Sequence, residues 1–263
     1  TTSEGGLNSE EGLVVERRFT SAGQDPFDSF EWITMDVEIR NPDGSMADSI
    51  EGVELPSGFS GVPGKVCAQK YLRKAGVPKF LRGVPEEGVP VWLQRSEPDH
   101  ERLQNLDVVD RMGGETDGRQ LFRRLAGTWT YWGWKYGYFA SEADARAYFD
   151  EMCYLIASQR SAPNSPQWFN TGLNWAYGIE GPPQGHSFVD PATGEVGLSA
   201  SAYERPQPHA CFIQSVSDSL VGGSDSIMGL WNREALLFKY GSGTGSNFSG
   251  IRGAGEPLSG GGT

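Results

Sequence analysis

The sequence is poor in cysteine and histidine, with three of each among 263 residues. Cys67, Cys153 and Cys211 are far apart and odd in number, which excludes the disulfide framework that holds many small secreted domains together. The cysteines have none of the paired spacings of a zinc site, and the three histidines share no ligand spacing. We therefore expect no metal site in this chain.

The sequence also lacks long apolar runs and an excess of positive charge. No run approaches the roughly 20 apolar residues that a membrane-spanning helix needs, and residues 1–13 show no basic and then apolar signal segment. The chain has 22 Lys and Arg against 34 Asp and Glu, a net charge of −12, which excludes general nucleic-acid binding. A pocket for a single nucleotide remains possible, because it needs only one or two cations and some backbone N–H groups. We expect a cytoplasmic protein without membrane or nucleic-acid partners.

The first half of the chain is predicted to be mostly helical after a polar beginning. Residues 1–28 are rich in Gly, Ser and Glu and are expected to be flexible. Apolar residues alternate over residues 33–40, the period of a half-buried strand. Residues 64–76 favour a short helix, and residues 83–117 a long connection. Ser141 is a predicted cap for a strong helix over residues 141–160.

From about residue 161 onward the pattern changes to alternating strand and helix. A Gly- and Pro-rich segment, residues 178–208, leads to a predicted strand over residues 210–216. A helix follows over residues 225–240, and Gly241 is its predicted end. Its expected buried side chains are those of Ile227, Leu230, Trp231, Leu237 and Phe238. This order of elements favours an α/β domain.

Residues 240–247, YGSGTGSN, allow two interpretations. Closely spaced glycines let a backbone approach a phosphate and expose N–H donors. The stretch lacks the Gly-Lys-Ser/Thr ending of a Walker A loop, and it follows a predicted helix, which does not fit a dinucleotide fingerprint. A plain tight connection is the favoured interpretation, and ligand contact is the alternative.

Two further features are predicted to be structural. Seven aromatic residues lie between Trp129 and Phe139; this density is more typical of a core or domain seam than of a platform that stacks on sugars or bases. Cys67 and Cys153 lie on predicted helices and are expected in the core. Cys211 begins a strand, and composition alone does not distinguish it from them.

From about residue 119 to 262 the chain resembles the vitamin B12-dependent (class II) ribonucleotide reductases. The similarity lies in the blocks LAGTWTYWGW, APNSPQWFNTG, YERPQPHACFIQSVSDSL and REALLFKYGSGTGSNFSGIRGAGEPLSGGG, and FEWITMDVEI is similar to the family's entry segment. The resemblance implies a helical region, residues 29–160, and then the first part of a ten-stranded α/β barrel, residues 161–263.

The resemblance also implies a reaction. In this family adenosylcobalamin generates a thiyl radical that removes the ribose 3′ hydrogen. The 2′ hydroxyl then leaves as water, and a cysteine pair supplies two electrons and becomes a disulfide, which a thioredoxin-type protein reduces. Ribonucleotides are the substrates, deoxynucleotides act as effectors, and the complete protein is expected to be a homodimer. The similar blocks look more like the ribonucleoside-diphosphate branch.

Site residues follow from the same resemblance. Cys211 matches the first member of the reducing pair, and its neighbour Ala210 a substrate contact. Ser165 and Gly243 match positions that hold the substrate. An effector segment is implied by Asp218, Ser219 and Leu220, and Arg252 matches a cation that pairs with effector phosphates, for which a guanidinium is well suited.

Two positions depart from the family pattern, and several parts are absent. Ser259 stands where relatives in the superfamily carry a second effector arginine, and Thr263 where relatives often have lysine. The radical cysteine, the second reducing cysteine and most cobalamin contacts are expected outside this chain, which is interpreted as an N-terminal portion that is inactive alone. Two alternatives remain: a non-catalytic regulatory subunit that keeps the effector site, and a carbohydrate-binding module built on the aromatic block.

Overall fold

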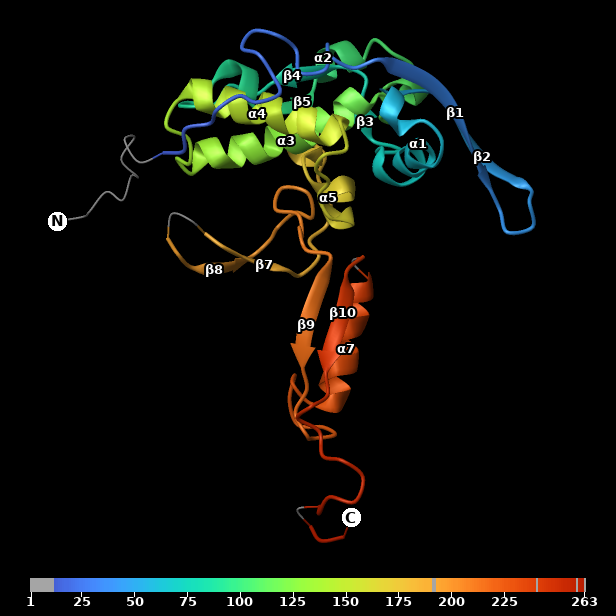
Figure 1. The fold of residues 1–263 in the computed structure, drawn as a ribbon, viewed down its shortest axis with the longest axis vertical. Coiled ribbons are helices and arrows are strands. Elements are labelled where there is room, and N and C mark those ends of the chain that lie inside the picture. Colours follow the sequence, from blue (N-terminus) through green and yellow to red (C-terminus); the bar gives the residue numbers. More distant parts are fainter. Residues whose placement is uncertain (1–11, 191–192, 240, 259, 263) are drawn as a thin grey trace, which may run out of the picture. The chain divides into compact units, whose positions relative to one another are not determined.

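A computed structural model describes residues 12–190, 193–239, 241–258 and 260–262 (Figure 1). The chain forms two compact units, residues 1–207 and 208–263, and each unit is considered by itself below. The segment after α4 belongs to the first unit because α5 and α6 pack against α3. No helix in the described part of the chain is both long and apolar enough to cross a bilayer.

The first unit is organised around a hairpin and two long helices. Strands β1 (Trp32–Arg40) and β2 (Met46–Pro56) pair antiparallel, and β1 confirms the strand predicted over residues 33–40. Helices α3 (Gly118–Lys135) and α4 (Glu142–Ala157) lie side by side (Figure 1). The predicted cap of α4 is confirmed, since the Asp144 N–H donates to the Ser141 hydroxyl. Helix α3 continues through most of the aromatic block, which the sequence pattern did not predict.

Short elements connect these main parts. The helix expected over residues 64–76 is shorter and begins earlier, as α1 (Val62–Val66) and the π-helical η2 (Cys67–Tyr71). The expected connection, residues 83–117, contains several short elements. The remaining elements of the unit are η1 (Ser57–Phe59), β3 (Val77–Pro78), β4 (Leu81–Gly83), η3 (Val91–Leu93), β5 (Ser96–Pro98), α2 (His100–Leu103), η4 (Val108–Asp110), β6 (Met112–Gly113), α5 (Ser165–Asn170), α6 (Leu173–Tyr177), β7 (Ser187–Val189) and β8 (Val196–Leu198).

The core of the first unit joins the base of the hairpin to η2, α3, α4 and α5. Both cysteines of this unit belong to it: Cys67 and Cys153 are buried, as predicted. Burial, followed by the charge of Glu115, raises the pKa of the Cys67 thiol to about 12. Burial also raises the pKa of Cys153 well above its usual value. Both thiols are therefore held in the protonated form and enclosed by apolar neighbours.

The described part of the N-terminal segment is anchored by carboxylates of α4. Asp144 Oδ1 accepts from the Val15 N–H at 2.8 Å, and Asp150 pairs with Arg17 at 2.8 Å. Glu151 Oε1 accepts hydrogen bonds from the N–H groups of Arg18, Phe19 and Thr20 at 3.1, 3.0 and 2.9 Å, and from the Thr20 hydroxyl at 2.7 Å. Residues 1–11 of the segment expected to be flexible lie outside the described residues.

A buried ion pair crosses the first unit. Arg124 of α3 is 1% exposed, and its Nε lies 2.7 Å from Glu115 Oε1. The same guanidinium donates to the backbone carbonyls of Thr171, Trp168 and Tyr71 at 2.7, 2.8 and 3.2 Å. One side chain therefore joins α3 to η2 and to the segment that contains α5.

Glu115 is satisfied from several sides as well. Its Oε2 accepts from the Arg73 N–H at 2.8 Å, and its Oε1 accepts from the Tyr177 hydroxyl at 2.8 Å. Burial and the nearby carboxylate raise the pKa of Tyr177, so its hydroxyl stays protonated and donates. Because every member has partners, this network meets the condition under which a buried charge is tolerated.

The second unit is a single strand–helix–strand motif. Strand β9 (Cys211–Ser215), helix α7 (Ile227–Lys239) and strand β10 (Gly243–Asn247) follow one another, and the two strands pair in parallel. The α/β alternation predicted for this part of the chain is confirmed, as are the predicted strand and helix. Two strands are no closed barrel, so the ten-stranded barrel is not seen among the described residues.

The predicted buried side of α7 is only partly correct. Leu230 is buried, but Trp231 and Phe238 are 66% and 58% exposed. The helix has one layer of two strands to pack against, and this layer covers one stripe of its surface. The other apolar stripe has no cover within the described part of the unit.

Replacement of Arg124 by Met should lower the free energy of unfolding by about 3–5 kcal/mol, because Glu115 would keep a buried charge without its partner. Chemical denaturation of the 263-residue chain measures this change. Arg82→Met is the matched control: Arg82 pairs with Glu97 at the surface, and its loss should cost at most about 1 kcal/mol. Equal effects of the two substitutions would contradict a stabilising role for the buried pair.

Candidate functional site

The parallel pair β9–β10 separates two faces of the second unit. Cys211, Ile213 and Ser215 of β9 are exposed, whereas Gln214 is buried on the other side. In the parallel register Gly243 lies opposite Cys211, and Gly245 lies opposite Ile213. Because partners in register point to the same side of a sheet, Cys211 and Gly243 share the face that α7 leaves open.

Polar side chains fix the other face to α7. The hydroxyls of Thr244 and Ser246 both donate to Glu234 Oε1, at 3.0 and 2.7 Å. Arg233 Nε donates to Gln214 Oε1 at 2.7 Å. Arg233 and Glu234 of α7 therefore hold β9 and β10 against the helix. The opposite face of the two strands, which carries Cys211, remains free. Arg233 and Glu234 lie in a block used for the resemblance, but nothing in their spacing predicted this role.

The three residues expected at the active site in this unit lie together. The Gly243 N–H donates to the Ala210 carbonyl at 2.6 Å, directly before Cys211. A Cβ added at Gly243 would lie 3.5 Å from Cys211 Sγ and 3.6 Å from the Ala210 oxygen. Glycine at this position thus leaves the thiol open on the side of β10. Cys211 itself is exposed and is not packed into an apolar core.

The glycine-rich stretch is a strand rather than an open loop. Residues 243–247 form β10, and the Gly243 N–H is already bonded to Ala210. That donor is therefore not free for a phosphate. The preferred interpretation from the sequence, a plain connection, is therefore wrong. In the alternative interpretation, a phosphate could bind only to backbone N–H groups that are not paired with β9.

Ser165 belongs to the first unit and is exposed at the start of α5. The helix is fixed on both sides of it: Trp168 Nε1 donates to the Pro163 carbonyl at 2.9 Å, and Arg124 holds the Trp168 carbonyl. No hydrogen bond to the Ser165 hydroxyl is found among the described residues. The hydroxyl is thus presented from a rigid turn and is available to a ligand.

The predicted effector residues are also adjacent in the second unit. Arg252 Nε lies 2.6 Å from Asp218 Oδ2, and both side chains are about one-third exposed. The carbonyls of Ser219 and Leu220 accept from the N–H groups of Ile227 and Met228, which begin α7. The segment is therefore held on the helix by its backbone. The Asp218–Arg252 pair lies at the surface, where an ion pair contributes at most about 1 kcal/mol, so a ligand can separate it at little cost.

Ser259 and Thr263, the two positions that depart from the family pattern, lie outside the described residues.

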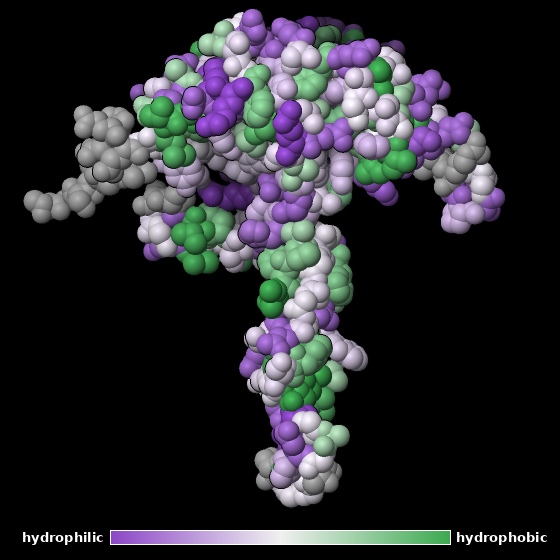
Figure 2. All heavy atoms as spheres, viewed as in Figure 1, coloured by the Kyte–Doolittle hydropathy of each residue, from purple (hydrophilic) through white to green (hydrophobic). Residues whose placement is uncertain are grey.

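The second unit also exposes many large apolar side chains for its size. Figure 2 shows apolar residues among the polar ones along this unit. They come from β9, the loop before α7, α7 itself and the C-terminal segment: Ile213, Leu220, Val221, Met228, Trp231, Leu236, Phe238, Phe248 and Leu258. Apolar surface of this extent is typical of a surface that another part of a protein covers.

Comparison with known proteins gives two family matches. Residues 34–159 match the family described as class II vitamin B12-dependent ribonucleotide reductase, and residues 209–263 match the barrel domain of ribonucleotide reductases. The second match begins at the boundary of the second structural unit.

Several similar proteins carry the name vitamin B12-dependent ribonucleotide reductase. The chain is 60% identical to the protein of Agrobacterium fabrum and 58% identical to that of Bradyrhizobium diazoefficiens, each over 250 residues. It is 33% identical to the protein of Rhodopirellula baltica over 253 residues. These alignments cover 95%, 95% and 96% of this chain but only 20%, 20% and 21% of the relatives. The chain thus spans about a fifth of the length of these relatives.

The three thiols should differ sharply in reactivity. Cys211 should react with a chromogenic disulfide reagent in the native chain, whereas the buried, protonated Cys67 and Cys153 should react only after unfolding. Thiol titration with and without denaturant measures this. Cys211→Ser should remove the native reaction entirely, and a fast reaction that persists in this variant would contradict the assigned exposure.

Proposed function

The chain belongs to the class II vitamin B12-dependent ribonucleotide reductases, and we propose that it forms the N-terminal part of an enzyme that reduces ribonucleoside diphosphates to deoxyribonucleotides. The observation that carries the proposal is the exposed Cys211 thiol beside Gly243 on the free face of β9 and β10. The family matches on both units support the assignment.

In this proposal Cys211 is one of two cysteines that supply the reducing electrons. Two thiols lose two electrons and two protons and form a disulfide. The ribonucleotide gains them, its C2′–O bond breaks, and the 2′ oxygen leaves as water. The second sulfur must lie within disulfide range, with Cα atoms roughly 4.4–6.8 Å apart. We assign it to polypeptide outside this chain, because Cys67 and Cys153 are enclosed in the core of the first unit.

The proposed substrate contacts use small groups near the thiol. At Ala210 and Gly243 the lack of bulk lets a ribose approach Cys211, and the one backbone hydrogen bond between them fixes their spacing. Ser165 offers a free hydroxyl, which suits a diphosphate oxygen without a requirement for lysine. Ser165 belongs to the other unit, so its part in the same site is a proposal drawn from the family pattern.

The proposed effector site is the surface around Asp218 and Arg252. The carboxylate can accept a hydrogen bond from a ribose hydroxyl or a base, and the guanidinium can bind phosphate oxygens. The backbone of Ser219 and Leu220 fixes this segment to α7. Because α7 also holds β9 and β10 through Arg233 and Glu234, a nucleotide at this surface acts on the helix that positions the Cys211 strand.

Membership of the family implies adenosylcobalamin as the cofactor, which supplies the radical that starts the reaction. Three pockets of the first unit are too small to hold it. The pockets found within the first unit have volumes of about 290, 330 and 430 Å³, which suits ligands at or below drug size. A corrinoid with its nucleotide tail is considerably larger. The cobalamin site is therefore assigned to the rest of the protein.

The complete enzyme is proposed to close the second unit into a ten-stranded barrel. Both edges of the β9–β10 pair and the apolar stripe of α7 lack cover among the described residues, and further strands and helices would provide it. The proposed partners are a second copy in a homodimer and a thioredoxin-type reductant. We propose the cytoplasm as its compartment, which would keep the cysteine pair reducible.

Complementation tests the proposed activity. The chain is mixed with a polypeptide covering the remaining four-fifths of a close relative, and reduction of a ribonucleoside diphosphate is measured with adenosylcobalamin and thioredoxin. Cys211→Ser should abolish multiple turnovers, because the electron pair cannot be regenerated. Arg82→Ala changes a surface residue of the first unit and should keep most of the activity. Unchanged turnover of the Cys211→Ser variant would remove this thiol from the mechanism.

Deoxynucleotide binding tests the proposed effector site in the same reconstituted enzyme. Asp218→Ala and Arg252→Ala should each weaken deoxynucleoside triphosphate binding about 10-fold or more, the loss expected for one charge-assisted hydrogen bond of about 1.5–3 kcal/mol. Calorimetric titration measures this. Arg82→Ala removes an arginine of the first unit and should leave the affinity unchanged. Wild-type affinity in both Asp218 and Arg252 variants would exclude this surface.

A further inference from the structure

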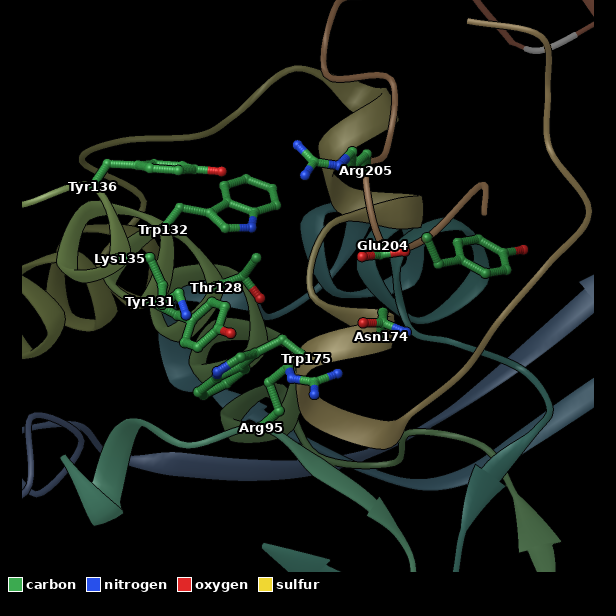
Figure 3. Close-up of a pocket in the computed structure, with 11 residues that line it drawn as sticks. Arg95, Thr128, Tyr131, Trp132, Lys135, Tyr136, Asn174, Trp175, Glu204 and Arg205 are labelled. Carbon is green, nitrogen blue, oxygen red and sulfur yellow. The ribbon is translucent and has the colours of Figure 1, made fainter. Parts of the chain in front are cut away.

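One pocket of the first unit has no role in the proposed function. It has a volume of about 290 Å³ and is built on α3, α6 and the segments around Arg95 and Arg205 (Figure 3). Its α3 wall consists of Thr128, Tyr131, Trp132 and Lys135, with Tyr136 at the end of the helix. These positions are spaced by three and four residues and therefore lie on one face of the helix.

The opposite side of the pocket is polar. Asn174 of α6, Glu204 and Arg205 lie across from the α3 wall, and Trp175 and Arg95 lie below it in the view of Figure 3. An aromatic helix face usually packs against apolar neighbours. In this pocket the aromatic rings face amide, carboxylate and guanidinium groups across an open space. This combination is typical of a binding pocket rather than of a core.

Part of the charge in the pocket is already neutralised. Lys135 pairs with Glu86, and the Tyr131 hydroxyl donates to the other oxygen of Glu86 at 2.7 Å. Burial raises the pKa of Glu86, but the hydrogen bonds from Lys135 and Tyr131 and the charges of Lys135 and Arg95 lower it overall. Glu86 is therefore ionised, and Lys135 is balanced by it.

One guanidinium group remains. Arg95 acts on Glu86 and Tyr131, whereas Arg205 has no salt bridge among the described residues and stacks on the Phe188 ring, 3.8 Å from its centroid. Stacking fixes the plane of the guanidinium and leaves its N–H edge available for an anion. With Lys135, Arg95 and Arg205 against Glu86 and Glu204, the pocket has an excess of one cation. In a chain with a net charge of −12, this local excess favours a negatively charged ligand.

A buried hydroxyl also lacks a partner. Thr128 is 2% exposed, and its Oγ1 makes no hydrogen bond among the described residues, although the side chain lines the pocket. The oxygen is enclosed by protein beside Gly172, so a ligand in the pocket does not reach it. Thr128 therefore contributes shape, and not a hydrogen bond, to the α3 wall.

We propose that this pocket binds a nucleoside monophosphate. The partly exposed rings of Trp132 and Tyr136 provide faces on which a base stacks, and Arg205 provides a fork for the phosphate. Glu204 offers a partner for ribose hydroxyls. The volume lies at the lower end of the range of about 300–1,000 Å³ for small-molecule pockets, which fits one nucleotide and not a dinucleotide. This goes beyond the proposed function, which assigns no ligand to the first unit apart from the Ser165 contact.

Titration of the 263-residue chain with AMP tests this proposal, with tryptophan fluorescence and calorimetry as readouts. Every measurement is made in the Arg252→Ala background, so that the proposed effector surface does not contribute. AMP should bind saturably, and adenosine or inorganic phosphate alone should bind at least about 10-fold more weakly, because each lacks half of the contacts. Adenosine that binds as tightly as AMP would overturn the role of the Arg205 guanidinium.

Variants locate the binding in the pocket. Arg205→Ala and Trp132→Ala should each weaken AMP binding at least about 10-fold, whereas Arg82→Ala, a surface arginine of the same unit, should not change it. No saturable binding of AMP at millimolar concentrations, or wild-type affinity in the Arg205 and Trp132 variants, would overturn the proposal.

Discussion

The buried pair of Arg124 and Glu115 is the interaction on which the organisation of the first unit depends. A guanidinium in a core needs hydrogen-bond acceptors, and each nitrogen of Arg124 has at least one, from one carboxylate and from carbonyls of η2 and the segment of α5. These segments are far apart in the sequence, so one charge requirement fixes their relative positions. The exposed start of α5 depends on this arrangement, and so does the face of α3 that lines the proposed nucleotide pocket.

The local sequence pattern predicted those helices and strands that form through capping or through one apolar face. The strand at residues 33–40, the Ser141-capped helix and the core positions of Cys67 and Cys153 are confirmed because each follows from periodicity, capping or apolar context. The division into compact units at residue 207 depends on tertiary contacts of α5 and α6 with α3, which no local pattern expresses. The strand at residues 243–247 was missed because glycine disfavours strands intrinsically, and only pairing with β9 overrides this preference.

The site residues required two different sources of inference. Nothing in composition separated Cys211 from the other cysteines, and the resemblance to a known family singled it out. The structure adds the geometry: Ala210, Cys211 and Gly243 meet at one corner, and Asp218 lies against Arg252. Arg233 and Glu234, which hold both strands on α7, could not be predicted, because a charged side chain on a helix ordinarily indicates a solvent-facing position. Their role appears only when the neighbouring strands supply hydroxyl and amide partners.

The anchoring of the N-terminal segment on Glu151 has a practical consequence for shortened versions of this protein. The polar composition of residues 1–28 suggests that they can be removed without harm. A version beginning after Thr20 would leave a carboxylate that is 8% exposed without three backbone donors and a hydroxyl. Removal of this segment would therefore leave the Glu151 carboxylate without its hydrogen-bond donors. Leu13, Val15 and Arg17 are also bonded to the first unit, through Tyr138 and Ala140, Asp144 and Asp150. The safe limit for truncation therefore lies before Leu13, and fusion partners belong upstream of it.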